Sequence, residues 1–253
     1  MKISLITVTY QSGKTLAGAM QSVLDQTYAD VEYIVVDGGS KDDTLTVVQD
    51  FAPRFGDRLR WISEPDKGIN DAMNKGIRMA TGEVVGILNS DDFFAAPDVL
   101  EKVAAAFGED ASLDGVYGDV RYVDAQDTTR VVRYYSSKGF RRKKLVYGLM
   151  PAHPSFYARR SCFGTYGGYD TRYRISADYD MFVRLFWKAR IRTRYLPMVF
   201  VDMRNGGASS SGFAARRLIM REHLQIVREH GVPSGFIRQS LRYFGKIVSL
   251  MRK

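Results

Sequence analysis

Apolar and polar positions alternate along the first 110 residues in a way that predicts strands and helices in turn. Short β-branched and apolar runs predict four strands, within "ISLITVTY" (3–10), "VEYIVVDGGS" (31–40), "LRWISEPDKG" (59–68) and "GEVVGILNSDD" (82–92). Segments with apolar residues at helical spacing lie between and after them and predict helices over 12–26, 42–52, 69–80 and 97–108. Strands that alternate with helices predict a Rossmann-like, doubly wound, mostly parallel α/β sheet.

The pattern becomes less regular after about residue 110. Residues 115–123 and 129–136 predict an antiparallel pair of strands. Residues 176–189 predict a strong helix with Ser176 as its N-cap, and 191–204 predict one or two strands. We therefore expect a small antiparallel addition to the parallel sheet.

Each of the four early strands ends in a cluster of polar residues. The clusters are Thr7–Tyr10, Asp37–Ser40, Glu64–Gly68 and Asn89–Asp92. In open α/β sheets, ligands bind at the carboxyl ends of the strands, so this layout predicts a nucleotide site. Neither the G-x-G-x-x-G fingerprint after a strand nor the G-x-x-x-x-G-K-[ST] loop occurs in the chain, which excludes the usual dinucleotide site and the P-loop.

The order and spacing of four motifs resemble the family 2 glycosyltransferases, which have the GT-A fold. The motifs are "TVTYQSGKTLAGAMQSVLDQTY", "VVDGGSKDDT", "EPDKGINDAMNKGIRMATGEVVGILNSDD" and "GGYDTRYRISADYDMFVRL". The likeness runs from Ile3 to about Arg204 and is nearest to bacterial enzymes that build exopolysaccharide, colanic acid or O-antigen chains. It implies a GT-A domain over 1–212, with a nucleotide-sugar half at about 1–110 and an acceptor half at about 111–212, followed by C-terminal helices over 213–253.

The adjacent carboxylates Asp91 and Asp92 repel each other at the end of a buried strand and call for a counter-charge. The resemblance implies that this counter-charge is a metal ion, because the family's D-x-D motif matches Asn89–Asp91, with Asn89 in place of the first Asp. Oxygen ligands suit Mn²⁺ or Mg²⁺. We expect Asp91 to bind the metal, and Asp92 either to assist it or to cap the following turn.

The resemblance also implies which residues hold the donor. It places Asp37 against the nucleobase, although a turn-forming Asp before two glycines is an ordinary alternative. Thr9 and Tyr10 belong to a first loop that covers the base and ribose in family members, and Lys67 is expected at the ribose or diphosphate. Asn89 and Ser90 complete the predicted nucleotide-sugar site.

Inverting transfer needs a general base that takes the proton of the acceptor hydroxyl. Family members usually present an "ED" pair at a helix start. Here that pair reads Ala177 and Asp178, so we predict Asp178 as the base and keep Asp180 as a rival. His153 and Tyr169 are weaker candidates for contacts to the acceptor, and packing is the alternative role for Tyr169.

Composition and charge limit the compartment and the partners. Hydrophobic residues make up 45% of the chain and charged residues 26%, as in an ordinary folded protein, and one cysteine, Cys162, allows no intramolecular disulfide. No apolar run is long enough for a membrane span, and residues 1–12 lack the features of a signal peptide. We therefore expect a cytoplasmic protein or one on the inner face of the cytoplasmic membrane.

The net charge of +9 is concentrated in residues 213–253, where nine Lys and Arg stand against two Glu. Residues 213–230 and 234–253 have apolar residues at helical spacing, and the second segment has five cations and no acid. This composition favours an amphipathic helix on an anionic membrane, where a polyprenyl-linked acceptor would lie. The alternative is that both helices pack on the domain or on a second subunit.

Three other function classes fit the chain less well. A sugar-1-phosphate nucleotidyltransferase would carry a Gly-rich signature with Arg near its N-terminus, which residues 3–15 lack. A binding protein on a decayed transferase fold need not retain Asp37, Asp91 and Asp178 together. Nucleic acid is not expected as a partner, because the positive charge is terminal and is not interleaved with a base-reading motif. The predicted activity is transfer of a sugar from a nucleoside-diphosphate sugar to a glycan or lipid-linked acceptor.

Overall fold

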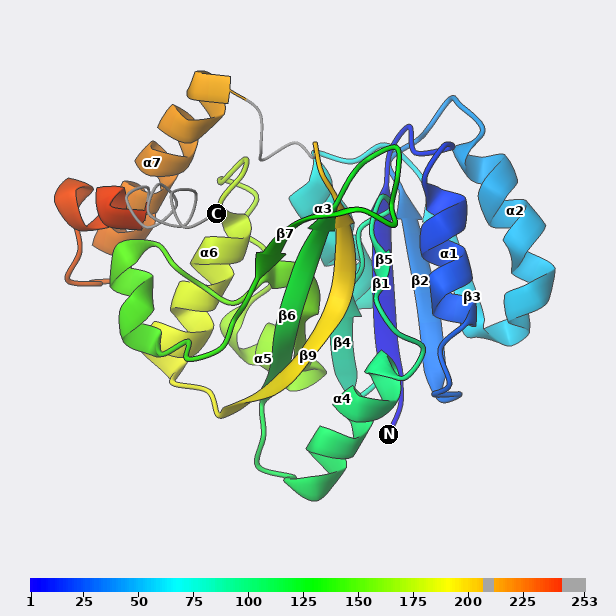
Figure 1. Ribbon diagram of the computed structural model, residues 1–253, viewed down its shortest axis with the longest axis horizontal. Coiled ribbons are helices and arrows are strands. Elements are labelled where there is room, and N and C mark those ends of the chain that lie inside the picture. The colour runs from blue at the N-terminus through cyan, green and yellow to red at the C-terminus, as the bar shows by residue number, and fades with distance from the viewer. Residues whose placement is uncertain (207–211, 243–253) are drawn as a thin grey trace.

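A single mixed sheet organises the part of the protein that the structure describes. The computed structural model describes residues 1–206 and 212–242 (Figure 1). Within them, nine strands form one sheet in the order β3-β2-β1-β4-β8-β6-β9-β5, and β7 pairs with β6. The mixed α/β fold expected from the sequence pattern is confirmed.

The first half of the chain follows the predicted alternation. Its elements are β1 (Ile3–Thr9), α1 (Leu16–Leu24), β2 (Val31–Asp37), α2 (Thr44–Phe55), η1 (Gly56–Arg58), β3 (Leu59–Ser63), α3 (Ile69–Met79), β4 (Val84–Ile87), β5 (Phe93–Phe94) and α4 (Val99–Glu109). Strands β1, β2, β3 and β4 pair with one another in parallel. Several boundaries differ from the prediction. Helix α1 starts at Leu16 and not at residue 12, because the backbone N–H groups of Ser12 and Gly13 are hydrogen-bonded to the side chains of Thr44 and Asp42. Helix α2 continues through Pro53, and α4 starts at Val99 after Asp98, so Pro97 precedes the helix.

The second half supplies the antiparallel addition. Its elements are β6 (Gly115–Val123), β7 (Val131–Tyr135), η2 (Arg142–Tyr147), η3 (His153–Ser155), β8 (Phe156–Arg159), α5 (Arg160–Tyr166), α6 (Ala177–Phe182), η4 (Val183–Ala189), β9 (Thr193–Arg204) and α7 (Gly212–Glu229). The predicted antiparallel pair is β6 with β7. Strand β8, which the sequence pattern did not predict, lies antiparallel between β4 and β6 and joins the two halves of the sheet.

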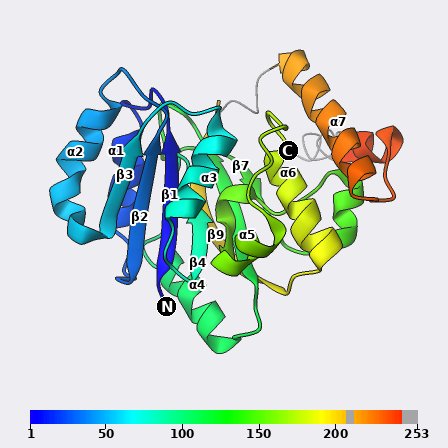
Figure 2. The same ribbon diagram turned by 180° about the vertical axis from the view of Figure 1, so that it is seen from behind.

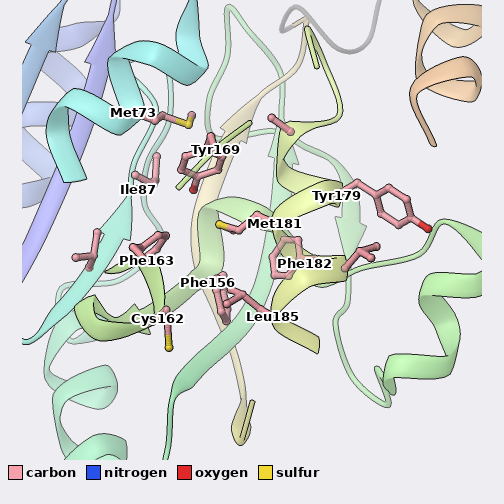
Figure 3. Packing of buried hydrophobic residues seen from close by; sticks show 14 of the residues in the cluster. Met73, Ile87, Phe156, Cys162, Phe163, Tyr169, Tyr179, Met181, Phe182 and Leu185 are labelled. Atoms are coloured by element: carbon pink, nitrogen blue, oxygen red, sulfur yellow. The ribbon is translucent and has the colours of Figure 1, made fainter. Parts of the chain in front are cut away.

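Helices cover both faces of the sheet. One face packs against α1, α2 and α4, and the other against α3, α5 and α6, as the two opposite views show (Figures 1 and 2). The second face has an aromatic core in which Phe156 and Phe182 contact each other (Figure 3). Phe186 contacts both of these rings. Cys162 is buried in this core, and burial raises the pKa of its thiol to about 11, in keeping with a packing role.

Gly86 is needed where the two halves of the sheet meet. It pairs with Tyr157 of β8, and a β-carbon at Gly86 would lie 2.2 Å from Cε1 of that ring. No side chain fits at this point, so the glycine lets β8 lie flat against the strand that leads to Asp91.

The segment predicted as one helix over 176–189 changes its winding. Regular α-helix α6 ends at Phe182, and residues Val183–Ala189 form the π-helix η4. Ser176 is the N-cap residue, but its hydroxyl makes no capping hydrogen bond. A π-helix is wider than an α-helix and occurs mostly in short pieces.

The C-terminal region divides into a packed helix and a short second helical segment. Ile226 and Val227 of α7 belong to the core on the α6 side of the sheet. Residues 236–242 are helical, and the rest of the predicted segment 234–253 lies outside the described residues, as do 207–211. No described helix is both long enough and apolar enough to cross a membrane. The division of the chain at residue 212 stays a prediction.

Candidate active site

The carboxyl ends of the parallel strands bring three predicted positions side by side. In the strand register, Thr9 of β1 pairs with Asp37 of β2, and Asp37 pairs with Ser63 of β3. On the other side of β1, the backbone N–H of Leu88 donates to the carbonyl of Ile6, which starts the loop to Asp91. The polar clusters therefore meet at one edge of the sheet, as the sequence predicts.

Asp37 organises its own loop. Its Oδ2 accepts hydrogen bonds from the backbone N–H of Gly39 (3.1 Å) and Ser40 (2.9 Å) and from the hydroxyl of Ser63 (2.6 Å), and its Oδ1 accepts one from the hydroxyl of Ser40 (2.5 Å). Asp37 is fully buried. The structure therefore shows the turn-forming role, and contact with a nucleobase stays a prediction.

Tyr10 lies over this loop and is 64% exposed. A β-carbon at Gly38 would lie 3.3 Å from Cδ2 of Tyr10 and 2.6 Å from Oδ2 of Asp66, so a side chain there would displace the Asp66 carboxylate. The hydroxyl of Thr9 is buried and has no hydrogen-bond partner among the described residues. The exposed ring of Tyr10 can pack against a planar ligand, and the buried hydroxyl of Thr9 keeps unused hydrogen-bonding capacity.

Hydrogen bonds fasten the first loop to its neighbours. The backbone N–H of Gln11 donates to Ser40 Oγ (2.8 Å), and the backbone N–H of Gly13 donates to Asp42 Oδ2 (3.0 Å). The hydroxyls of Ser12 and Ser90 are 3.0 Å apart and share a hydrogen bond. The loop that carries Tyr10 is thereby connected both to the Asp37 loop and to the loop that carries Asp91.

The two adjacent acids have different surroundings. Asp92 is buried, and its carboxylate accepts hydrogen bonds from Asn89 Nδ2 (2.8 Å) and from the backbone N–H of Arg204 (3.2 Å). Within residues 1–206 and 212–242, no other residue's side chain donates to Asp91, which is half-buried. Asp92 thus holds the turn against β9, while the carboxylate of Asp91 has no hydrogen-bond donor from another side chain in the described residues.

Burial makes this acid pair costly when both groups are charged. Burial raises the pKa of Asp91, and burial together with the charge of Asp91 raises the pKa of Asp92 to about 7. Two hard oxygen donors in this state fit a divalent cation, which would stabilise both ionised forms. No group of three or more His, Cys, Asp or Glu gathers anywhere in the described residues, so phosphate or water oxygens would have to complete such a site.

The turn that carries Lys67 is held by residues of α3. The backbone N–H of Lys67 donates to Asp71 Oδ2 (3.1 Å), and its side chain is exposed. Lys75 holds the turn before it by contacting the Pro65 carbonyl and the Glu64 carboxylate, both at 2.9 Å. The predicted contact of Lys67 with the donor stays a prediction, on a loop that α3 keeps in place.

Helix α3 also connects the first half of the sheet to the segment before Asp178. Asn70 Nδ2 donates to the Tyr173 carbonyl (2.7 Å). Asn74 donates to the Tyr169 carbonyl (2.7 Å) and accepts from the Tyr169 N–H (2.8 Å). The amides of two neighbouring turns of α3 therefore fix the path of 169–173.

Asp178 is a half-buried carboxylate at the start of α6. Burial, with a smaller contribution from the charge of Glu222, raises its pKa to about 6. The other titratable groups that its charge affects are the phenols of Tyr135 and Tyr169. Among the residues that the structure describes, no cation contributes to this shift. An acid with a pKa near 6 is suited to accept a proton near neutral pH.

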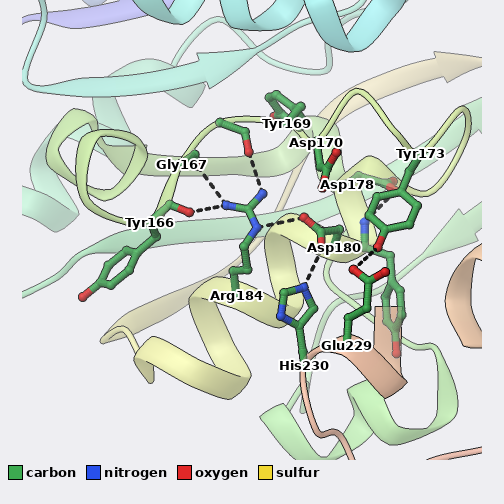
Figure 4. Close-up of polar contacts among 12 residues, drawn as sticks. Tyr166, Gly167, Tyr169, Asp170, Tyr173, Asp178, Asp180, Arg184, Glu229 and His230 are labelled. Atoms are coloured by element: carbon green, nitrogen blue, oxygen red, sulfur yellow. Dashed lines mark hydrogen bonds and ion pairs between the residues drawn. The ribbon is translucent and has the colours of Figure 1, made fainter. Parts of the chain in front are cut away.

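Asp180 has a structural partner set. Its carboxylate pairs with Arg184 Nε (2.8 Å) and with His230 Nε2 (2.7 Å) (Figure 4). Arg184 in turn donates to the carbonyls of Tyr166, Gly167 and Gly168. This network fixes the turn before α6. Because the carboxylate of Asp180 is already paired with Arg184 and His230, Asp178 is the better candidate for the base.

His153 and Tyr169 contact each other in the core. His153 Nε2 lies 2.6 Å from the hydroxyl of Tyr169, which is 4% exposed. Burial lowers the pKa of His153 to about 4, so the ring is neutral at pH 7. The burial of Tyr169 and its contact with His153 agree with the packing role expected as the alternative, and the acceptor contacts of both residues stay predictions.

Comparison with known proteins adds a family to this geometry. The sequence profile described as Glycosyl transferase family 2 matches residues 4–167. The chain belongs to glycosyl transferase family 2. Its fold agrees with solved GT-A structures, so the recognition of the family from the four motifs is confirmed.

Two relatives resemble this family 2 glycosyltransferase in sequence. A PGL/p-HBAD biosynthesis glycosyltransferase of Mycobacterium bovis is 34% identical over 218 residues, 86% of this chain and 82% of the relative. Chondroitin synthase of Escherichia coli is 31% identical over 183 residues, which are 72% of this chain and 26% of that protein.

Two solved structures share the fold. S. aureus TarS 1-349 in complex with UDP-GlcNAc has a TM-score of 0.70 at 20% identity and covers 96% of this chain and 73% of its own. The mannosyltransferase PcManGT from Pyrobaculum calidifontis, in complex with GDP-Man and Mn²⁺, has a TM-score of 0.66 at 20% identity, with 92% and 65% covered.

Sequence reasoning about this glycosyltransferase missed Arg204. Its guanidinium lies 5.4 Å from the centre of the Phe93 ring, and its charge opposes the upward shifts in the pKa of Asp91 and Asp92. Arg204 Nε is buried without a hydrogen-bond partner among the described residues. In the sequence, Arg204 is only an Arg at the end of a predicted strand. Its contact with the Asp91–Asp92 turn arises because β9 pairs with β5 in the sheet.

The sequence also gave no sign of Glu222 as a positioning residue for Asp178. Its buried carboxylate accepts hydrogen bonds from the backbone N–H groups of Arg174 (2.8 Å), Ile175 (3.1 Å) and Ser176 (2.8 Å). These groups precede α6, so α7 holds the start of the helix that carries Asp178.

Replacing Glu222 by Gln is expected to lower the free energy of unfolding by about 1–3 kcal/mol, because an amide cannot satisfy the three N–H groups as the charged carboxylate does. Removing the charge should also lower the pKa of Asp178, so the acid limb of the pH–rate profile moves to lower pH. Urea unfolding and a pH–rate profile measure the two effects.

Glu229→Gln is the matched control, since it removes the same charge from the same helix at a position that contacts Arg172 and Tyr173. The positioning role of Glu222 is wrong if both variants unfold alike and leave the acid limb where it is in the unmodified chain.

Proposed function

We propose that this glycosyltransferase moves a sugar from a nucleoside-diphosphate sugar, in the first place a UDP-sugar, with inversion at the anomeric carbon. The observation that carries the proposal is the open carboxylate of Asp91 at the sheet edge where the Tyr10 and Asp37 loops meet. In this scheme the first loop, with Thr9 and Tyr10, covers the base and ribose, and Asn89 and Ser90 shape the donor site.

Asp91 is the proposed ligand of Mn²⁺ or Mg²⁺, with Asp92 bracing it. A bound divalent cation would offset the charge of the leaving diphosphate. Lys67 supplies a further positive charge near the donor. The structures with bound UDP-GlcNAc and with GDP-Man and Mn²⁺ support a nucleotide sugar and a metal on this fold.

Asp178 is the proposed general base. In a single displacement it takes the proton of the acceptor hydroxyl as that oxygen attacks the anomeric carbon, and the bond to the diphosphate breaks. Its raised pKa keeps it basic enough to accept the proton and ionised above about pH 6. We propose a glycan or polyprenyl-linked acceptor in cell-surface polysaccharide synthesis, with the enzyme on the inner face of the cytoplasmic membrane.

The donor class is tested by thermal shift with UDP-, GDP- and dTDP-sugars in the presence of Mn²⁺. A donor at a hundred times its Kd adds about 2.7 kcal/mol, which corresponds to a rise in Tm on the order of 5–10 °C for a chain of this size. We expect the largest rise with a UDP-sugar, and a smaller one when EDTA replaces Mn²⁺. A larger rise with a GDP-sugar would contradict the UDP assignment, and no rise with any of them would contradict the nucleotide site.

The rival function is a protein that binds a sugar nucleotide without transfer. The observation in its favour is that Asp37 holds its own loop, a role that a protein without catalytic activity could also keep. Release of nucleoside diphosphate from the selected donor separates the two, because a transferase slowly hydrolyses its donor when no acceptor is present. A chain that binds the donor but releases no diphosphate, with or without acceptor extracts, would favour the rival.

A further inference from the structure

Two acid-free stretches of the chain gather positive charge. Residues 128–169 contain no Asp or Glu, and five of the seven residues 138–144 are Lys or Arg. Residues 230–242 also lack acids. The first stretch includes η2, and the second includes the helical segment 236–242.

The fold brings these stretches together at one end of the molecule. Ser234 Oγ donates to the Val146 carbonyl (2.5 Å), and the buried Gln239 donates to the same oxygen (3.2 Å). Both ribbon views place η2 and the last helical turns side by side, at the end of the sheet away from α2 (Figures 1 and 2). Segments about 90 positions apart in sequence therefore form one surface.

This surface, called the basic face below, combines cations with exposed apolar side chains. Its exposed cations are Lys138, Arg141, Arg142, Lys143, Lys144 and Arg238, and its exposed apolar residues are Tyr147, Leu149, Phe236, Ile237 and Leu241. None of these six cations forms a salt bridge with a carboxylate in the described ranges. Phe236 is 65% exposed and Ile237 is 78% exposed.

We propose that the basic face docks on an anionic membrane surface. Its cations would lie against acidic headgroups while Phe236, Ile237 and Leu241 enter the interface. A water-soluble polyanion would satisfy the cations but would leave these aliphatic and aromatic side chains in water, whereas a bilayer buries them. The mixture of both kinds of side chain therefore favours a membrane over nucleic acid or an acidic glycan.

The basic face is fastened to the catalytic helix. The hydroxyl of Tyr179 donates to the Leu145 carbonyl (2.6 Å) and accepts from Gln239 Nε2 (3.2 Å), and its ring stacks on His223 at 3.8 Å. Tyr179 follows Asp178 directly. Docking would thus hold α6 near the bilayer, where a lipid-linked acceptor lies. The benefit to catalysis rests on the proposed function, whereas the docking itself does not.

Vesicle flotation of the full chain tests the basic face. The chain should float with vesicles of phosphatidylcholine and phosphatidylglycerol but not with phosphatidylcholine alone, and less so at high salt. The triple variant Arg141→Gln, Lys143→Gln, Lys144→Gln should weaken binding at least about tenfold, since each cation near such a surface contributes to the attraction. Ile237→Ser should weaken the binding that remains at high salt.

A matched triple variant controls for net charge. Lys2→Gln, Arg54→Gln, Lys102→Gln removes the same three charges from exposed positions outside the basic face and should bind almost as the unmodified chain does. Equal loss in both triple variants, equal flotation with neutral vesicles, or binding to heparin without flotation would overturn the proposal. Thermal melts confirm that each variant is folded.

The flotation test and the test of the proposed function can fail independently. Donor turnover measured without vesicles should be unchanged in both triple variants, because none of their residues touches the donor site. A chain that floats as expected but turns over no sugar nucleotide overturns the proposed function and leaves the docking face supported. A chain that turns over donor but never floats overturns the docking face and the proposed membrane location, and leaves the proposed donor and transfer chemistry supported.

Discussion

Replacing Asp178 by Asn is expected to lower sugar transfer by about two to four orders of magnitude while donor binding stays the same. The amide keeps the size of the side chain but cannot accept the proton of the acceptor hydroxyl. Because the pKa of Asp178 is raised to about 6, the rate of the unmodified enzyme should fall as pH drops through 6 and should be level above it. Donor affinity by calorimetry and transfer rates from pH 5 to 8 measure both effects.

Asp180→Asn serves as the control for this prediction. Asp180 pairs with Arg184 and His230 inside the protein, so its replacement should reduce stability first and leave the pH dependence of the remaining activity intact. A variant Asp178→Asn that keeps full transfer would remove Asp178 from the mechanism. An α-linked product from an α-linked donor would show that the transfer is not a single displacement.

Replacing Asp91 by Ala is expected to abolish metal-dependent turnover, by about three orders of magnitude or more, since a catalytic metal supplies several kcal/mol. The reason lies in the contrast between the two acids: Asp92 is held by Asn89 and by the backbone of Arg204, whereas no other side chain in the described residues donates to Asp91. Turnover against Mn²⁺ concentration measures the effect, and paramagnetic resonance of free Mn²⁺ measures metal binding independently of activity.

Asp92→Asn is the matched control for Asp91. We expect it to unfold more easily, because Asp92 is buried and joins the turn to β9, and to keep part of its metal affinity. Full activity of Asp91→Ala, or of the unmodified chain in excess EDTA, would contradict a metal role for Asp91. Loss of metal from Asp92→Asn alone would move the ligand to Asp92.

The sequence by itself determined the elements whose side-chain pattern repeats locally. Strands β1 to β4 are short apolar runs, and helices α1 to α4 have apolar faces, so periodicity predicted them within a few residues. The same alternation fixed the parallel sheet, whose strand ends bring Thr9, Asp37 and the Asp91 loop to one edge. Motif order then identified the family before any contact was known.

Only the tertiary structure decided the arrangement of the second half of the chain. Strand β8 is four residues long and β5 is two, too short for a periodic signal, yet β8 joins the halves of the sheet and β5 brings β9 to Asp92. The π-helical winding of η4 is likewise absent from the apolar pattern, which is that of an ordinary helix over 176–189.

The roles of individual charged residues also came from long-range contacts. Arg204 lies 112 positions from Asp92, and Glu222 lies 46 from Ser176, so no local pattern links the members of either pair. The basic face likewise joins residues near 146 with residues near 239. Sequence periodicity reports which side of an element is apolar, but which distant element covers that side is set by the packing of the whole chain.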